Sequence, residues 1–198
     1  MNALRTATTS LLLATVPVLA HADDMSYRYI QLNYIETDCD CSVPDAEGFA
    51  TRGSIGFAKN YFVFTELARQ TITVSGPNVD IDQYAVGLGG HYGLSDKLDL
   101  VGRAGWTRVK VSGDDEIGSD TLNFEDDGYL VAIGLRGQVG EHVQLEGSVI
   151  HQDFGGGNDD TGVEVLARYH FNKHFALAAE YQISDDVSSF LAGVRLSF

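Results

Sequence analysis

Several stretches of this 198-residue chain alternate between apolar side chains and side chains that are small or polar. Within 49–57, Phe49, Ile55 and Phe57 fall on one side of the alternation and Arg52 falls on the other. The same two-residue period runs through 84–92, 129–139 and 190–198. A period of two is the pattern of β-strands with two unlike faces. The chain is therefore expected to be an all-β protein.

A soluble β-sandwich would alternate in the same way, but two details favour a membrane barrel. The polar face carries isolated charges in mid-strand, and the apolar face ends in aromatic residues at a repeated distance, as in Phe49 to Phe57 and Phe190 to Phe198. That distance spans roughly 20 Å of tilted strand, close to the apolar band of an outer-membrane barrel between its aromatic girdles. By this spacing the outer girdle comprises Tyr34, Phe49, Tyr84, Trp106, Tyr129, Tyr181 and Phe190, and the inner girdle Phe57, Tyr61, Tyr92, Phe171, Phe175 and Phe198.

The pattern predicts a closed antiparallel transmembrane β-barrel of ten strands, with eight strands as the alternative if one hairpin is a loop excursion. The expected strands are 26–36, 48–58, 61–71, 82–93, 97–111, 127–139, 142–154, 161–171, 174–184 and 188–198. Short and long connections alternate between them. Short turns face the periplasm in single-chain bacterial barrels, so both termini are expected there. An open sheet edge is not tolerated in lipid, so the last strand must pair with the first.

The two ends of the chain carry expected export and assembly signals. Residues 1–22 combine Arg5, an apolar stretch of about ten residues, too short to span a bilayer, and the small-residue site Ala20-His21-Ala22. This is typical of a secretory signal peptide cleaved after Ala22, which leaves 23–198 as the barrel domain. The apolar alternation before the terminal aromatic resembles the signal read by the barrel assembly machinery. Its residues are Phe190, Val194, Leu196 and Phe198.

The predicted interior face carries an unusual number of charges. They are Arg52, Glu66, Asp99, Arg103, Arg136, Glu146, Glu164, Arg168, Glu180 and Arg195. Counting from the short turns places Arg52 diagonal to Glu66, Arg136 opposite Glu146, and Arg168 within reach of Glu180. A lone buried charge costs far more than a paired one, so a structural network of ion pairs is expected. The alternative is the lining of a narrow pore for small solutes.

Acidic residues outnumber basic ones by 28 to 13, a formal net charge of −15. This balance argues against a nucleic-acid partner, because few cations are available for phosphates. Most of the acidic residues fall in or near the longer connections, such as 36–47 and 112–127. They are solvated loops or binding sites for divalent cations that bridge to lipopolysaccharide. No connection has EF-hand spacing, so no metal site is assigned.

Cys39 and Cys41 are the only cysteines. Export implies an oxidising compartment, so a disulfide within this loop is favoured over free thiols. Gly-x-Ser-x-Gly and His-Glu-x-x-His motifs are absent from the sequence, and His151 and Asp153 at an outer strand end lack an identifiable catalytic partner. We therefore expect no enzyme, no catalytic residues and no cofactor.

Three segments and the chain end resemble one protein family. They are 27–38, GFATRGSIGFAKNYFVF at 48–64, VDIDQYAVGLGGHYGLSDKLDLVGRAGW at 79–106 and FLAGVRLSF at 190–198. This pattern resembles the small diffusible-signal-factor-regulated outer-membrane proteins of xanthomonad-type bacteria. The resemblance implies a Gram-negative outer-membrane barrel linked to biofilm and virulence, with no enzyme activity and no site residues defined by a motif.

Two functions are therefore expected from different classes. The first is a non-enzymatic surface barrel whose acidic loops contribute to envelope integrity, adhesion or virulence. Its partners would be outer-membrane lipid and lipopolysaccharide, with the barrel assembly machinery during biogenesis. The second is a narrow porin-like channel lined by arginine and glutamate. Fold alone does not choose between them.

Overall fold

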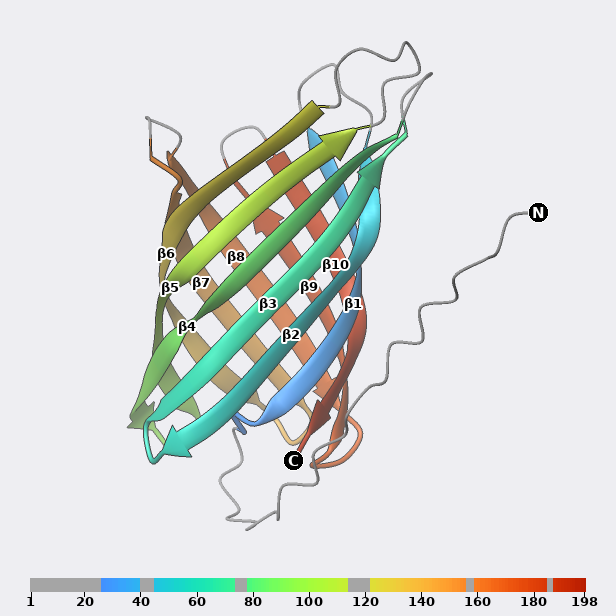
Figure 1. The fold of residues 1–198 in the computed structure, drawn as a ribbon. Coiled ribbons are helices and arrows are strands. Elements are labelled where there is room, and N and C mark those ends of the chain that lie inside the picture. The colour runs from blue at the N-terminus through green and yellow to red at the C-terminus, as the bar shows by residue number, and fades with distance from the viewer. Residues whose placement is uncertain (1–25, 40–44, 74–77, 114–121, 156–158, 185–186) are drawn as a thin grey trace, which may run out of the picture.

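The computed structural model describes residues 26–39, 45–73, 78–113, 122–155, 159–184 and 187–198. These residues form ten antiparallel strands that close into one tilted barrel (Figure 1). The strands are β1 (Tyr29–Cys39), β2 (Ala46–Ala58), β3 (Tyr61–Ile72), β4 (Val79–Ser95), β5 (Leu98–Gly113), β6 (Leu122–Val139), β7 (Val143–Asp153), β8 (Asp159–His170), β9 (Phe175–Ile183) and β10 (Val187–Ser197). The predicted fold class and the count of ten are confirmed, and the eight-stranded alternative is wrong.

The barrel closes through β1 and β10, which pair from Tyr29 opposite Ser197 to Cys39 opposite Val187. The backbone amide of Phe198 continues this pairing by donating to the carbonyl of Arg28 at 3.1 Å. The sheet therefore has no free edge at this seam, as a lipid environment requires.

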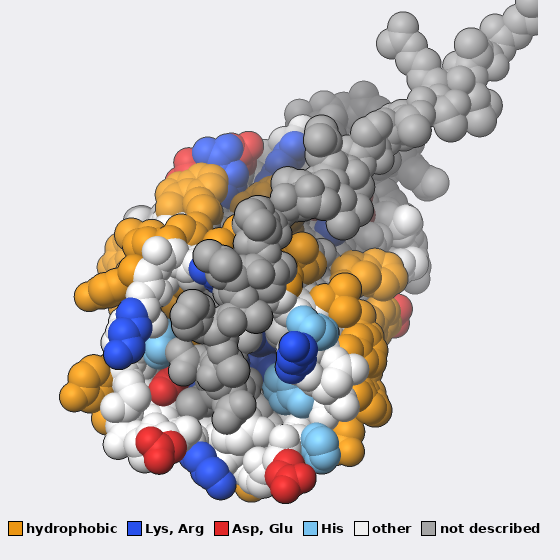
Figure 2. Space-filling model, turned by 90° about the horizontal axis from the view of Figure 1, so that it is seen from below, with side chains coloured by type: hydrophobic (Ala, Val, Ile, Leu, Met, Phe, Trp, Pro, Cys, Tyr) orange, Lys and Arg blue, Asp and Glu red, His pale blue; other side chains and the backbone are white. Residues whose placement is uncertain are grey.

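The barrel is apolar outside and polar inside, which inverts the arrangement of a soluble protein. Along β2, Phe49, Ile55 and Phe57 are exposed while Arg52 and Ser54 are buried. Figure 2, a view from below, shows hydrophobic side chains around the wall and charged, polar and histidine side chains at this end. All predicted girdle residues are exposed on the wall except Phe175, which is partly buried. This distribution matches a wall facing lipid and a lumen facing protein.

The upper part of the wall is uneven in height. β4, β5 and β6 have 17, 16 and 18 residues, whereas β9 has 9. β6 continues for seven residues beyond Tyr129, to Leu122, which is about 23 Å along the strand. Figure 1 shows β5 and β6 rising at the end opposite the chain's C-terminus. The predicted strand 127–139 is too short at this end, because residues 122–126 were assigned to a loop.

A second difference from the predicted strands concerns the start of β1. Its pairing begins at Tyr29 rather than at residue 26. Ser26 and Tyr27 instead contact side chains inside the barrel, which places them at the lower end of the lumen, and Arg28 connects them to β1. We call residues 26–28 the N-terminal plug. The other strand boundaries differ from the prediction by a few residues, because bulged or twisted ends are not visible in an alternating pattern.

Part of the lumen is apolar. Phe62, Phe64, Val101 and Leu130 form a buried cluster against which Tyr27 packs. Gly89 makes room for it, because a Cβ there would overlap the Phe62 ring. A smaller cluster nearer the upper end comprises Ile35, Ala50, Leu191 and Ala68. These residues fill space between the charged groups described next.

Candidate functional site: the charged lumen

A lattice of ion pairs crosses the middle of the lumen, with Arg52 at its centre. Both terminal nitrogens of Arg52, on β2, contact the carboxylate of Glu180 on the non-adjacent strand β9, one of them at 2.8 Å. Arg52 also lies 3.6 Å from Glu164 and 3.7 Å from Glu66. Arg103 joins the same carboxylates, at 2.9 Å from Glu66 and 3.2 Å from Glu164. Two arginines and three glutamates from five strands therefore tie the walls together.

Neutral side chains complete this lattice. Ser148 donates to Glu164 at 3.3 Å, and the amide of Gln182 donates to Glu164 at 3.2 Å and to Glu180 at 2.6 Å. Glu164 and Glu180 are 1% and 2% exposed. Buried carboxylates are tolerated when charged and neutral donors satisfy them. The carboxylates of the lattice therefore have their hydrogen bonds satisfied within the protein, which fits a structural network better than a binding site.

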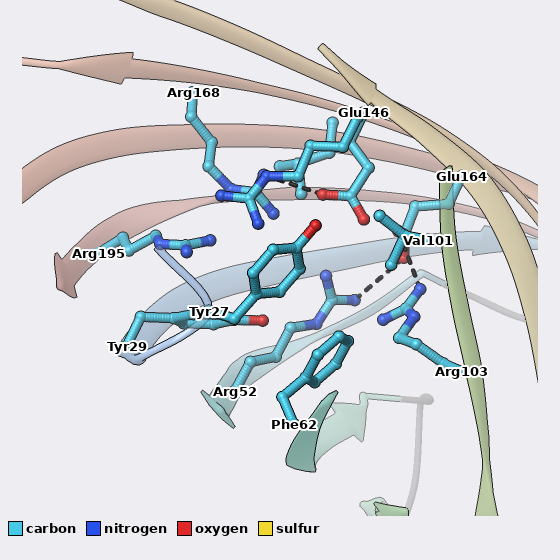
Figure 3. Close-up of a pocket in the computed structure, with 12 residues that line it drawn as sticks. Tyr27, Tyr29, Arg52, Phe62, Val101, Arg103, Glu146, Glu164, Arg168 and Arg195 are labelled. Carbon is cyan, nitrogen blue, oxygen red and sulfur yellow. Dashed lines mark hydrogen bonds and ion pairs between the residues drawn. The ribbon is translucent and has the colours of Figure 1, made fainter. Parts of the chain in front are cut away.

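A second group of charges lies nearer the short turns. Arg136, Arg168 and Arg195 reach into the lumen from β6, β8 and β10, and Glu146 enters from β7. Arg168 lies 2.9 Å from the Glu146 carboxylate and donates to Gln144 at 2.9 Å. We call Arg136, Arg168 and Arg195 the lower arginine cluster. Figure 3 shows Arg168 and Arg195 directed toward Tyr27, with Arg52 and Arg103 near Glu164 on the other side.

The N-terminal plug covers this cluster. The Tyr27 ring stacks on Phe62 and His91, with centroids 4.9 and 4.2 Å apart, and the Arg136 guanidinium lies 4.5 Å from the Tyr27 centroid. The Tyr27 hydroxyl donates to Asp99 at 2.9 Å. Burial raises the pKa of the Tyr27 phenol above its ordinary value, so this hydroxyl remains a donor.

The backbone of the plug is held as firmly as its side chain. The carbonyl of Ser26 accepts from Arg195 at 2.7 Å and from Arg136 at 3.3 Å. The carbonyl of Tyr27 accepts from the Ser54 hydroxyl at 2.7 Å. Together with arginines and glutamates of the lattice, the plug lines a cavity of about 20 Å³, close to the volume needed for a single water.

The predicted neighbouring pairs have mixed outcomes. Arg52 lies directly opposite Glu66 in the register, not diagonal to it. Arg136 does lie opposite Glu146, but the carboxylate bonds to Arg168.

Arg168 and Glu180 are diagonal neighbours in the register, as predicted, but no ion pair between them is found among the described residues. Arg168 lies opposite Ala178, and Glu180 bonds across the lumen to Arg52. Counting residues from a turn predicts contacts between adjacent strands only. In a closed barrel, long side chains from non-adjacent strands also meet in the lumen. The remaining predicted interior charge, Asp99, is buried beside His91, 3.3 Å from its Nδ1 atom.

Two interior positions were missed as functional candidates. Tyr27 and Tyr29 share the inward parity of the buried β1 residues Gln31, Asn33 and Ile35. The Arg195 guanidinium lies 3.5 Å from the centroid of Tyr29. Large aromatics at inward positions near the chain start could have indicated the plug.

At the upper end, many acidic residues assigned to loops lie on strands. Asp80 and Asp82 belong to β4, and Glu125 and Asp127 belong to β6. The acidic positions within 40–44, 114–121 and 185–186 lie outside the described residues. Among the described residues, no group of three or more His, Cys, Asp or Glu side chains could hold a metal ion. Cation binding therefore stays a prediction.

The cysteine and assembly predictions are placed as follows. Cys39 is disulfide-bonded, whereas Cys41 lies outside the described residues, so their pairing stays a prediction. The four assembly residues Phe190, Val194, Leu196 and Phe198 are all exposed on the outer wall of the seam. In the described part of the chain, no helix is long and apolar enough to cross a membrane.

Comparison with known proteins agrees with this architecture. Residues 6–186 match the family described as the outer membrane protein beta-barrel domain. The chain belongs to this family. It is therefore an outer-membrane β-barrel protein of a Gram-negative bacterium. Searching the curated proteins gives no match.

Solved barrels share the fold at low sequence identity. The NanC porin is 9% identical, with a TM-score of 0.50 over 85% of this chain and all of its own. The translocator domain of the autotransporter NalP from Neisseria meningitidis is 12% identical, with a TM-score of 0.50 over 86% of this chain and 87% of its own. Ail of Yersinia pestis is 15% identical, with a TM-score of 0.46 over 86% of this chain and 95% of its own.

Proposed function

We propose that this protein is a closed, non-enzymatic surface barrel that contributes to envelope integrity, adhesion or virulence through its charged upper rim. The filled lumen carries this proposal. A lattice of buried ion pairs, an apolar cluster and the N-terminal plug lie inside the barrel, and residues from all three line a cavity of about 20 Å³. A solute-conducting channel needs a continuous water-filled path, and this lumen favours a protein that acts through its outer surface.

The rim that would act is the extension of β3 to β6 above the outer girdle. Its outward face carries alternating charges at Arg69, Asp80, Asp82, Arg108, Lys110, Glu125 and Asp127, which we call the outer charge ladder. Arg69 lies 3.3 Å from both Asp80 and Asp82.

Arg108 holds the other side of the ladder. It lies 2.6 Å from both Glu125 and Asp127, and its guanidinium lies 5.1 Å from the Trp106 centroid. Four carboxylates face three basic groups, so the ladder keeps an acidic surplus. Paired strands make it a stiff surface, which suits recognition better than a mobile loop does.

The proposed absence of catalysis is supported at the upper end of β7. His151 exchanges a hydrogen bond with Thr161 at 2.9 Å. Asp153 accepts from the Tyr129 hydroxyl at 3.0 Å and from the backbone amide of Gly155 at 2.6 Å. Both side chains thus have structural partners and do not face each other across a substrate site.

The remaining parts of the proposal follow from the sequence. Residues 1–22 act as a cleaved signal peptide, 23–198 form the barrel domain, and both termini face the periplasm because the short turns lie at their end. The β10 motif is read by the barrel assembly machinery. Lipopolysaccharide surrounds the upper girdle, and divalent cations bridge it to the acidic rim. Within its family, the protein is grouped here with the diffusible-signal-factor-regulated barrels.

A narrow pore is the second candidate. It is favoured by one observation. The described contacts between the N-terminal plug and the lumen wall are noncovalent, such as the 2.7 Å hydrogen bond from Arg195 to Ser26. Displacing the plug would uncover an arginine-lined passage at the lower end. The lattice around Arg52 would still obstruct the middle of the lumen.

Neutralising the outer charge ladder tests the surface role. In Gram-negative cells that express the protein, changing Asp80, Asp82, Glu125 and Asp127 to their amides is expected to reduce surface attachment several-fold, toward the level of non-expressing cells. The acidic surplus that would bind a basic or cation-bridged surface is then lost. Attachment is measured as retained cell mass, and detergent sensitivity reports envelope integrity.

The matched control changes acidic residues at the opposite end, Asp96→Asn with Glu141→Gln, which should leave attachment unchanged. Each variant must reach the outer membrane and shift on gels when boiled. Wild-type attachment by the ladder variant, or no gain from expressing the wild-type protein, would refute the surface role.

A further inference from the structure

The lower arginine cluster contains more positive charge than the described residues balance. Arg136, Arg168 and Arg195 are 2%, 4% and 1% exposed. Glu146 is the one carboxylate with a described ion pair to any of them. Burying a guanidinium without a counter-charge is costly. Three buried guanidinium groups beside one carboxylate therefore call for a further negative group.

Unpaired donors point to the same missing group. Nε of Arg136, Nε of Arg168, Nη1 of Arg195 and Nε2 of Gln144 are buried and have no hydrogen-bond partner among the described residues. All four atoms can donate and none can accept. A water molecule would bring two donors of its own into this donor-rich place, whereas an anion brings only acceptors.

The partner that is present is neutral. The Ser26 carbonyl accepts from both Arg136 and Arg195, but it carries no net charge. All three arginines line the cavity of about 20 Å³ (Figure 3). Its other charged lining residues are Arg52, Arg103, Glu146 and Glu164, so arginines outnumber carboxylates there by five to two. The cavity holds roughly one water-sized particle.

We propose that Arg136, Arg168 and Arg195 form a buried site for one small anionic group, closed from below by the N-terminal plug. The cavity of about 20 Å³ suits a halide ion or a single carboxylate group better than a larger tetrahedral oxyanion. The site is independent of the proposed surface role, because it lies inside the barrel and away from the outer charge ladder.

Two sources can supply this chemistry. One is chloride from the medium. The other is the chain itself, since Asp23 and Asp24 lie two or three positions before Ser26 in the sequence. A carboxylate from either would neutralise the cluster as a halide would. The experiment must therefore separate a free anion from an internal one.

The first arm measures thermal unfolding of the refolded chain beginning at Asp23, in sodium bromide against sodium gluconate at equal ionic strength. A bound free halide raises the unfolding temperature by roughly 3–5 °C for each tenfold rise in halide above its dissociation constant. Arg195→Gln should abolish this dependence. Arg69→Gln, which removes an exposed arginine of the outer charge ladder, should retain it.

The second arm repeats the titration on the double variant Asp23→Asn with Asp24→Asn. If the wild type ignores halide and this variant responds to it, the chain's own carboxylate occupies the site. Anomalous scattering from crystals grown in bromide gives a readout that needs no arginine variant, with one expected peak among the three guanidinium groups.

The two arms distinguish a free halide from the chain's own carboxylate, and they include results that would overturn the proposed site. Halide dependence in either protein, lost on Arg195→Gln, supports the site. No halide dependence in either protein, together with no bromide peak in crystals of either, overturns it. Equal halide effects in the wild type and Arg195→Gln would also overturn it, because they would report a general salt effect.

Discussion

Replacing Arg52 with methionine is expected to lower the free energy of unfolding of the barrel by about 3–5 kcal/mol. Arg52 touches all three carboxylates of the central lattice, and both of its terminal nitrogens contact Glu180. Without Arg52, Arg103 would be the only arginine described in contact with this lattice, and it does not contact Glu180. An uncompensated buried charge is among the most destabilising changes a core can receive.

Urea unfolding in detergent micelles measures this loss of stability. Unfolding is monitored by the gel shift and by the fluorescence of Trp106, the single tryptophan. Arg69→Met is the matched control, because its ion pairs are exposed at the rim, and it should change stability by less than about 1 kcal/mol. Adding Glu180→Met to Arg52→Met should recover part of the loss, since it removes the stranded charge. A loss below 1 kcal/mol for Arg52→Met would show that the lattice does not hold the walls together.

Replacing Tyr27 with alanine is expected to cost about 3 kcal/mol and to loosen the lower end of the lumen. The ring is stacked between Phe62, His91 and the Arg136 guanidinium, so its removal leaves a space beside a charged cluster. The effect is measured by urea unfolding and by the rate at which a thiol reagent reaches a cysteine introduced at Val101, which lines the same cavity.

Tyr27→Phe is the graded control. It keeps the ring contacts and removes only the hydrogen bond to Asp99, so it should cost about 1 kcal/mol and leave the labelling rate low. If Tyr27→Ala is as stable as the wild type and labels no faster, residues 26–28 do not close the barrel. In that case the lower end would be sealed by the arginines alone.

The strand faces, the number of strands and the pairing of adjacent strands could be predicted, because they depend on residues close together in the sequence. The alternation of Phe49, Ile55 and Phe57 with Arg52 and Ser54 reports a strand face directly, because successive side chains point to opposite sides. Turn lengths then gave the strand number and the Arg136–Glu146 register. These inferences need only local geometry and the rule that a sheet in lipid must close.

Contacts across the lumen could not be predicted in the same way. The bond between Arg52 and Glu180 joins β2 to β9, which are separated by β1 and β10. It depends on the curvature of the closed barrel and cannot be found by counting along adjacent strands. The plug was missed for a related reason. Tyr27 continues the inward parity of Tyr29, so the pattern extended β1, while the packing of its ring on Phe62 draws it into the lumen.

Single-channel recording of the refolded wild-type protein in a planar bilayer tests the closed barrel most directly. Folding is first verified by the gel shift on boiling. We expect no discrete conductance steps, because the lattice around Arg52 and the plug at Tyr27 obstruct a continuous aqueous path. Regular steps from the wild-type protein, absent from the boiled sample, would contradict this expectation and make the barrel a pore.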